Sequence, residues 1–132
     1  MTLRISLRDG EPVIINGALL RARGRTDFTL ENQCTVLRGR DIMMPDQATS
    51  PARELYYCCQ MAYVEPEFRQ DHQKRLLEVL KIIFDQASGP GVVQPAVAMA
   101  QKVAQGDFYA ALADCRQLMA AEDTLPEASE AA

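Results

Sequence analysis

LRGRDIMMPDQATSPARELYYCCQMAYVEP, residues 37–66, contains the point at which the hydrophobic period of the chain changes. Before this stretch, apolar and polar residues tend to alternate, which is typical of half-buried β-strands. After Asp46, apolar residues recur every three or four positions, which is typical of an amphipathic helix. Ser50 is a natural N-cap for that helix, and Pro51 suits its first position, where the missing N–H does no harm. The stretch therefore separates a β-rich half from a helical half.

The N-terminal half, residues 1–42, is predicted to form a small antiparallel sheet. Turn-forming pairs recur every few residues, and Asn16-Gly17 is the clearest of them. Both residues accept the positive φ that a tight type I′ hairpin requires. This hairpin is predicted to pair residues 12–15 with residues 18–22.

The C-terminal half, residues 50–121, is predicted to form four amphipathic helices with short connections. The helices are expected at 51–66, 66–87, 93–105 (with Pro95 in the first turn) and 107–121. Residues expected on the buried face of the second helix are Phe68, His72, Leu76, Val79, Leu80 and Ile83. Residues 43–49 are interpreted as a short hinge, and residues 122–132 as a flexible acidic tail. The fold class is α+β, a single domain with the small sheet packed on a bundle of about four helices.

Length, composition and charge indicate an ordinary globular protein. The chain has 132 residues, a 48% hydrophobic content and a net charge of -4, values at which one compact core is feasible. The N-terminus lacks the basic start and apolar run of a signal peptide. The most apolar helical stretch is broken by charges and is too short to span a bilayer. We therefore expect a cytoplasmic protein without a membrane partner.

Metal binding and catalysis find little support in the sequence. Four cysteines, Cys34, Cys58, Cys59 and Cys115, form no C-x-x-C pair, and His72 is the only histidine available as a companion ligand. Reduced thiols are therefore expected, with no metal and no cofactor. No phosphate-cradling glycine loop or hydrolase motif is present, and His72 is interpreted as a core or interface residue. The prediction is a non-enzyme.

Arginines dominate the positive charge of the first half. Residues 1–55 hold eight arginines and seven carboxylates, and every basic residue before Lys74 is an arginine. The planar guanidinium suits phosphates and guanine edges. Because residues two or four apart share a strand face, these arginines are predicted to form a basic patch for RNA. The candidate residues are Arg4, Arg8, Arg21, Arg23, Arg25, Arg38, Arg40 and, on the first helix, Arg53.

Two observations leave room for other interpretations of these arginines than an RNA-binding patch. The arginines of a half-exposed sheet can instead keep its outer face hydrated and pair with nearby carboxylates, namely Asp9, Glu11, Asp27, Glu31 and Asp41. Exposed aromatic rings, which usually stack on single-stranded RNA bases, are scarce, since the β half offers only Phe28. Arg53 lies in a first helical turn, where a cation is mildly unfavourable; it is either functional or paired with Asp41 or Asp46.

The amino-acid sequence along most of the chain resembles the FlbT family, the flagellar biosynthesis repressors of alphaproteobacteria. Residues 37–43 resemble the family's "LR..DIM" strand end, residues 51–56 its "PAR.LY" helix start, and residues 61–66 its "MAYV.P" exit. Asn16-Gly17 and the segment 106–112 add to the likeness. Ala110 departs from it, because family members often carry a lysine there. For this reason the site is expected on the sheet and not on the last helix.

The resemblance implies a post-transcriptional regulator that binds the 5′ untranslated leader of flagellin mRNA and controls its translation or decay. It supplies no catalytic residues. The main alternative is a protein-interaction adapter or chaperone-like factor, whose helical half binds a flagellar regulatory or secretion protein and acts on mRNA only indirectly. Its support is the negative net charge and the six methionines, including Met43, Met44 and Met61, which suit an adaptable apolar surface. A third interpretation is a homodimer formed through the small sheet.

Overall fold

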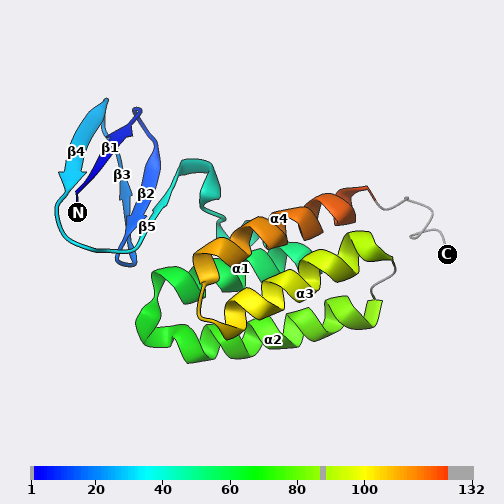
Figure 1. Cartoon of the computed structure of the whole chain (residues 1–132). Coiled ribbons are helices and arrows are strands. Elements are labelled where there is room, and N and C mark those ends of the chain that lie inside the picture. The colour runs from blue at the N-terminus through cyan, green and yellow to red at the C-terminus, as the bar shows by residue number, and fades with distance from the viewer. Residues whose placement is uncertain (1, 87–88, 125–132) are drawn as a thin grey trace.

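The computed structural model describes residues 2–86 and 89–124, and it combines an antiparallel β half with a four-helix half (Figure 1). The α+β prediction is confirmed. The strands are β1 (Leu3–Leu7), β2 (Pro12–Ile15), β3 (Ala18–Arg21), β4 (Thr26–Leu30) and β5 (Val36–Arg38). Short 3-10 turns η1 (Gly39–Asp41), η2 (Pro45–Gln47) and η3 (Pro66–Phe68) accompany the helices α1 (Pro51–Val64), α2 (Arg69–Gln86), α3 (Pro90–Ala104) and α4 (Phe108–Asp123).

The predicted hairpin is confirmed. β2 pairs with β3 in antiparallel register, with Ile15 opposite Ala18. Asn16 and Gly17 have φ values of 50° and 85°, the left-handed conformation that a type I′ turn needs. A Cβ on Gly17 would lie 3.1 Å from the Val64 carbonyl oxygen, so the glycine also lets the hairpin approach the end of α1.

The β half forms two small sheets, where the sequence predicted one. β1 pairs with β4, and β2 lies between β3 and β5. The division follows from β2, whose alternating side chains are buried on both faces: Ile14 joins the helical core, whereas Val13 packs with Ile5 and Leu7 of β1. A strand buried on both sides requires a cover for its second face, and the β1–β4 pair supplies that cover.

The helices form three close interfaces. α1 packs against α2 and α4, and α3 packs against α4, whereas α2 and α3 touch each other only slightly. Four of the six positions predicted on α2 are buried, and on α4 the apolar residues at helical spacing are buried. Phe68 is an exception: it lies in η3, before α2 begins, and is 53% exposed. No helix in the described ranges is both long and apolar enough to cross a membrane.

Helix starts were predicted best where a capping residue is present. Ser50 accepts a hydrogen bond from the Arg53 amide of α1 at 3.3 Å, and Asp107 accepts one from the Ala110 amide of α4. The predicted start of the third helix is wrong, because α3 begins at Pro90. Pro95 consequently lies inside the helix and not in its first turn.

The start of the segment between the two halves, which was interpreted as a hinge, is anchored to α1. The buried Gln60 side chain of α1 accepts from the Met43 amide at 2.7 Å and donates to the Met43 carbonyl at 2.9 Å. The Tyr56 hydroxyl donates to the Asp41 carbonyl at 2.6 Å. Buried backbone groups need such partners, and here α1 provides them for the chain that enters it.

The start of the predicted flexible tail is also ordered. Glu122 accepts hydrogen bonds from the Ser50 hydroxyl at 2.5 Å and from the Ala52 amide at 2.8 Å. Arg53 pairs with Glu122 at 3.3 Å and with Asp123 at 2.9 Å, not with Asp41 or Asp46 as expected. The tail prediction is therefore wrong for residues 122–124, and its remainder, residues 125–132, lies outside the described residues.

Replacing Glu122 by alanine is expected to lower the free energy of unfolding by about 1–2 kcal/mol. The reason is that the Ala52 amide, in the first turn of α1, and the Ser50 hydroxyl both lose their acceptor. Urea unfolding of both proteins measures the difference. Asp123→Ala serves as the control. Its carboxylate is more exposed and pairs only with Arg53, so the expected loss is below about 0.5 kcal/mol. Equal losses in the two variants would contradict the capping role.

Candidate functional site

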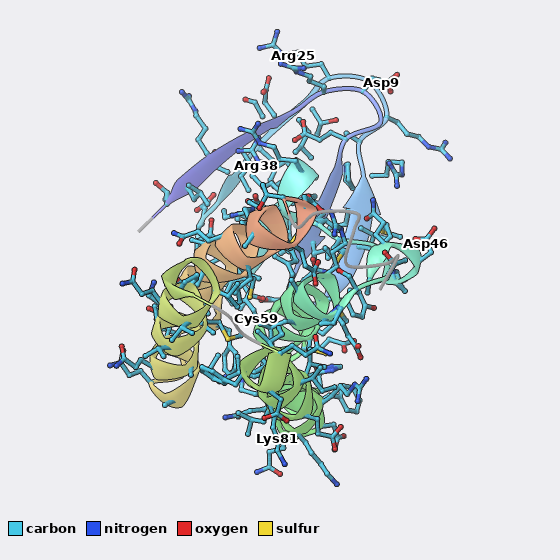
Figure 2. The ribbon with its side chains drawn as sticks, turned by 90° about the vertical axis from the view of Figure 1, so that its right-hand side faces the viewer. Asp9, Arg25, Arg38, Asp46, Cys59 and Lys81 are labelled. Atoms are coloured by element: carbon cyan, nitrogen blue, oxygen red, sulfur yellow. The ribbon has the colours of Figure 1, made fainter. Side chains whose placement is uncertain are left out.

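An open hollow of about 1340 Å³ lies where the β half meets η1. Its lining includes four of the eight arginines that the sequence singled out, namely Arg8, Arg25, Arg38 and Arg40. Figure 2 shows Arg25 beside Asp9 at the end of the β half farthest from the helices, with Arg38 closer to them. The carboxylates of Asp9, Glu11 and Asp41 also line the hollow. We call these four arginines and their surroundings the arginine hollow.

Loops, and not a strand face, bring these arginines together. β3 ends at Arg21 and β5 ends at Arg38, so the predicted strand alternation is wrong for Arg23, Arg25 and Arg40. Arg25 follows a bend at Gly24, whose amide donates to the Asp9 carboxylate at 2.7 Å. This bond holds the bend against the turn that carries Arg8. Arg40 reaches the same hollow because η1 turns the chain directly after β5.

Three of the four guanidiniums are unpaired among the described residues. Arg8, Arg25 and Arg40 form no side-chain hydrogen bond or ion pair there. Arg38 is engaged, because it donates to the Ser6 carbonyl at 2.8 Å and lies 4.0 Å from Glu11. The predicted alternative, in which neighbouring carboxylates neutralise the arginines, is thus observed only at Arg38.

The carboxylates of the hollow are occupied by other donors. Asp9 accepts from the Gly24 amide, Glu11 from the Arg8 amide at 3.0 Å, and Asp41 from the Arg116 guanidinium of α4. Each carboxylate can accept up to about four bonds, but among the described residues only Arg38 of the four arginines lies within ion-pair distance of one. The hollow therefore keeps donors that are available to an external anion.

The helical half shows the opposite pattern, because most of its cations are engaged. Arg75 pairs with Glu54 at 2.7 Å, and Lys102 pairs with the buried Asp114 at 2.9 Å. Arg69 donates to the Ala62 carbonyl and lies over the Phe108 ring. Available positive charge is therefore concentrated in the β half.

The remaining predicted site residues lie outside the lining of the hollow. Arg4 is on β1 opposite Thr29, and Arg21 donates to the Gly10 carbonyl at 2.7 Å. Arg23 precedes Gly24 in the bend. Arg53 is held by the carboxylates at the end of α4. The structure thus brings together half of the predicted set.

A polar network that the sequence did not reveal supports the hollow from the helical side. Arg116 of α4 pairs with the Asp41 carboxylate and donates to the Tyr56 hydroxyl at 2.9 Å. Burial is the main reason why the pKa of Tyr56 rises to about 12. Sixty residues separate Arg116 from Tyr56, so no local pattern could have indicated the pair. Through Asp41 the network holds η1, and with it Arg40.

Two of the thiols, Cys58 and Cys115, are held in the neutral form. Burial, assisted by Glu54, raises the pKa of Cys58 to about 11. A hydrogen bond to Cys59, together with burial, raises the pKa of Cys115 well above its usual value, and Figure 2 places Cys59 among the helices. A raised pKa disfavours the reactive thiolate. His72 was predicted as a core or interface residue, but it is only half-buried and contacts Glu65 at 2.8 Å.

Stability should decline in alkali, because the buried acids Cys58, Cys115 and Tyr56 are held neutral. The pKa of Cys58 is raised from 9.0 to about 11 and that of Tyr56 from 10.0 to about 12. Each contribution is complete below the unfolded pKa and is lost as the pH rises through the folded one. The free energy of unfolding should therefore stay constant from pH 7 to 9 and fall by about 2 kcal/mol per group by pH 12. Urea unfolding across this range measures the decline.

A Cys58→Ala variant tests the origin of this decline. It should make the decline between pH 9 and 11 shallower, since one of the titrating thiols is gone while Cys115 and Tyr56 remain. Cys34→Ala, which removes a partly exposed thiol, is the control and should keep the full slope. A Cys58→Ala protein with an unchanged slope would assign the alkaline loss to other groups.

The methionines do not form the adaptable surface that the adapter interpretation expected. Met43 is buried and contributes to the helical core, as does Met99. Met61 is only partly exposed, and Met44 alone of the named three is well exposed. A protein-binding surface on the helical half therefore has to be sought among other side chains.

Comparisons with known proteins agree on one family. The family model described as "Flagellar protein FlbT" matches residues 3–125. The flagellum biosynthesis repressor protein FlbT of Caulobacter vibrioides is 34% identical over 128 residues, which are 93% of this chain and 88% of that protein. A probable repressor of the same name from Agrobacterium fabrum is 32% identical over 124 residues, 94% and 83% of the two chains. No solved structure matches this one.

Proposed function

Because this chain belongs to the FlbT family, we propose that it regulates flagellum synthesis by binding the 5′ untranslated leader of flagellin mRNA in the arginine hollow. The relatives' names describe repressors of flagellum biosynthesis and not enzymes. A regulatory role in flagellar synthesis follows from this family membership. RNA as the ligand and the hollow as its site are the further steps that we propose.

The observation that carries the proposal is the set of unpaired guanidiniums at Arg8, Arg25 and Arg40. A guanidinium presents a planar fork of donors that matches two phosphate oxygens. Three such forks around one open hollow suit a ligand with several phosphates in a bent path. An RNA backbone has this property, and its affinity comes largely from phosphate contacts.

The chemistry of the hollow favours contacts to the RNA backbone over base stacking. Phe28 is the only aromatic residue of the β half, and it packs against the small core behind the strands, as the sequence predicted. Without an exposed ring, the stacking that usually holds single-stranded bases is unavailable there. Selectivity should therefore come from RNA shape and from arginine contacts to guanine edges.

The test is a titration of the purified protein with a flagellin leader and with a scrambled RNA of equal length, over a range of salt concentrations. We expect tighter binding of the leader, with the logarithm of affinity falling by about 0.7 per neutralised phosphate for each tenfold rise in salt. Equal, weak binding of both RNAs would reject direct leader recognition and favour an indirect effect through a protein partner.

A further inference from the structure

The helical half leaves one side of the bundle incompletely covered. α1 and α4 are central, α2 packs on α1, α3 packs on α4, and α2 and α3 touch only slightly. A closed four-helix bundle would bury the flanks by which α2 and α3 approach each other. Here those flanks stay partly open, so their composition indicates what could cover them.

Large apolar side chains occupy both flanks. On α2, Leu77 is 50% exposed and Phe84 is 38% exposed; on α3, Val93 is 40% exposed and Val97 is 41% exposed. Leu77 and Phe84 are seven residues apart, and Val93 and Val97 four apart, so each pair lies on one side of its helix. We call these four residues the apolar strip.

Contacts of neighbouring residues orient the strip on α2. Arg69 lies within about one quarter turn of Leu77 and Phe84 around the helix, and its guanidinium is 5.0 Å from the centre of the Phe108 ring, at the start of α4, where the short connection from α3 ends. Arg75, on the opposite flank, pairs with Glu54 of α1. The side of α2 that carries Leu77 and Phe84 therefore faces α3.

The same argument orients α3. Lys102 reaches Asp114 of α4 at 2.9 Å, which identifies the flank of α3 that faces α4. Val93 and Val97 lie more than a third of a turn away from Lys102 around the helix. They consequently lie on the flank toward α2, and the four apolar residues form one surface.

Two lysines lie nearer to this surface on α2 than the acidic residues do, because Glu78 and Asp85 directly follow Leu77 and Phe84 and so lie about 100° farther around the helix. Lys74 and Lys81 are exposed and form no ion pair among the described residues. Lys74 precedes Leu77 by three positions, and Lys81 precedes Phe84 by three, so each ammonium adjoins an apolar member of the strip. Figure 2 shows Lys81 on the outer side of the bundle, away from the β half. The facing positions on α3, Gln94 and Gln101, are uncharged.

We propose that the apolar strip binds an amphipathic helix of a protein partner, one whose apolar face is bordered by acidic residues. Helices recognise such surfaces through apolar residues at i, i+3, i+4 and i+7. The unpaired lysines select acidic flanks by charge complementarity. This site is separate from the arginine hollow, so protein and RNA can be bound at the same time.

Two designed peptides test the proposal. Each has about five helical turns and a leucine stripe; one carries glutamates beside the stripe and the other carries lysines. The full chain should bind the acidic peptide at least tenfold more tightly than the basic one. Lys74→Glu combined with Lys81→Glu should reverse the preference. Equal affinities, or a preference that this variant leaves unchanged, would overturn the proposal.

Substitutions in the strip test the apolar part. Phe84→Ser should weaken binding of the acidic peptide at least tenfold, and Val97→Ser should weaken it less, because truncation of a buried aromatic anchor has the larger effect. Ile82→Ser is the matched control: Ile82 is 41% exposed on the opposite flank of α2, and its loss should leave affinity unchanged. Thermal unfolding of all three variants ensures that only folded proteins are compared.

A second copy of the chain is the competing occupant. Sedimentation of the wild type and of Phe84→Ser, without peptide, decides this point. A monomer in both cases supports a separate partner. A wild-type dimer that Phe84→Ser dissociates would assign the strip to self-association and overturn the proposal.

Discussion

Replacing Arg8, Arg25 and Arg40 together by alanine is expected to weaken binding of a flagellin leader about 1000-fold or more at low salt. Each substitution removes one unpaired guanidinium from the arginine hollow, and a charge-assisted hydrogen bond contributes about 1.5 kcal/mol or more. The salt dependence should also become shallower by about 2, since three phosphate contacts at about 0.7 each are lost. RNA titrations of variant and wild type at several salt concentrations give both quantities.

A charge-matched control separates the hollow from general positive charge. Replacing Arg4, Lys74 and Lys81 removes the same formal charge from exposed positions outside the lining of the hollow. Affinity should then fall only slightly, through the long-range field. Equal losses in the two triple variants would reject the hollow as the site while leaving RNA binding itself intact.

The Gln60→Ala substitution is expected to be one of the most destabilising polar changes in the chain. The side chain is 2% exposed and makes two hydrogen bonds with the backbone of Met43. Its loss leaves a buried donor and a buried acceptor without partners, at about 1–3 kcal/mol each, and adds a cavity. We expect a loss of about 3–4 kcal/mol, which lowers the Tm by about 10 °C. Thermal and urea unfolding measure it.

Gln101→Ala is the control for this prediction, because Gln101 is exposed on α3; its loss should change stability by less than about 0.5 kcal/mol. Gln60→Glu adds a finer test, since a carboxylate can still accept from the Met43 amide but cannot donate to its carbonyl. At pH 7 the loss should equal or exceed that of Gln60→Ala, because an ionised carboxylate is then buried against a carbonyl oxygen; protonation at low pH restores a donor and should reduce the difference from the wild type. A fully stable Gln60→Ala protein would show that residues 43–49 are not held by this bond.

One part of the resemblance has a structural explanation. The Tyr56 hydroxyl donates to the Asp41 carbonyl. Two matching residues, one directly after the strand end and one in the first helix, therefore contact each other. These matching residues stabilise the junction between the two halves, and the match does not by itself indicate contact with RNA.

The arginine hollow was foreseen only in part. Arginine abundance in the first half was visible in the sequence, and four of the eight candidates do line one hollow. Strand alternation, however, was the wrong reason for their proximity, because Arg25 and Arg40 lie on turns. Which arginines are unpaired also depended on distant donors, such as Arg116 for Asp41.

Local chemistry was sufficient for the hairpin at Asn16-Gly17, the start of α1 at Ser50 and the buried face of α4, because turns, caps and helical periodicity depend on residues a few positions apart. Long-range contacts determined the remainder. The division into two sheets, the cap that Glu122 places on α1 and the set of unpaired arginines all depend on residues that are distant in the chain. Packing decides which polar partners meet, and in this protein it left unpaired arginines at the end of the β half and an apolar strip bordered by two lysines on the helices.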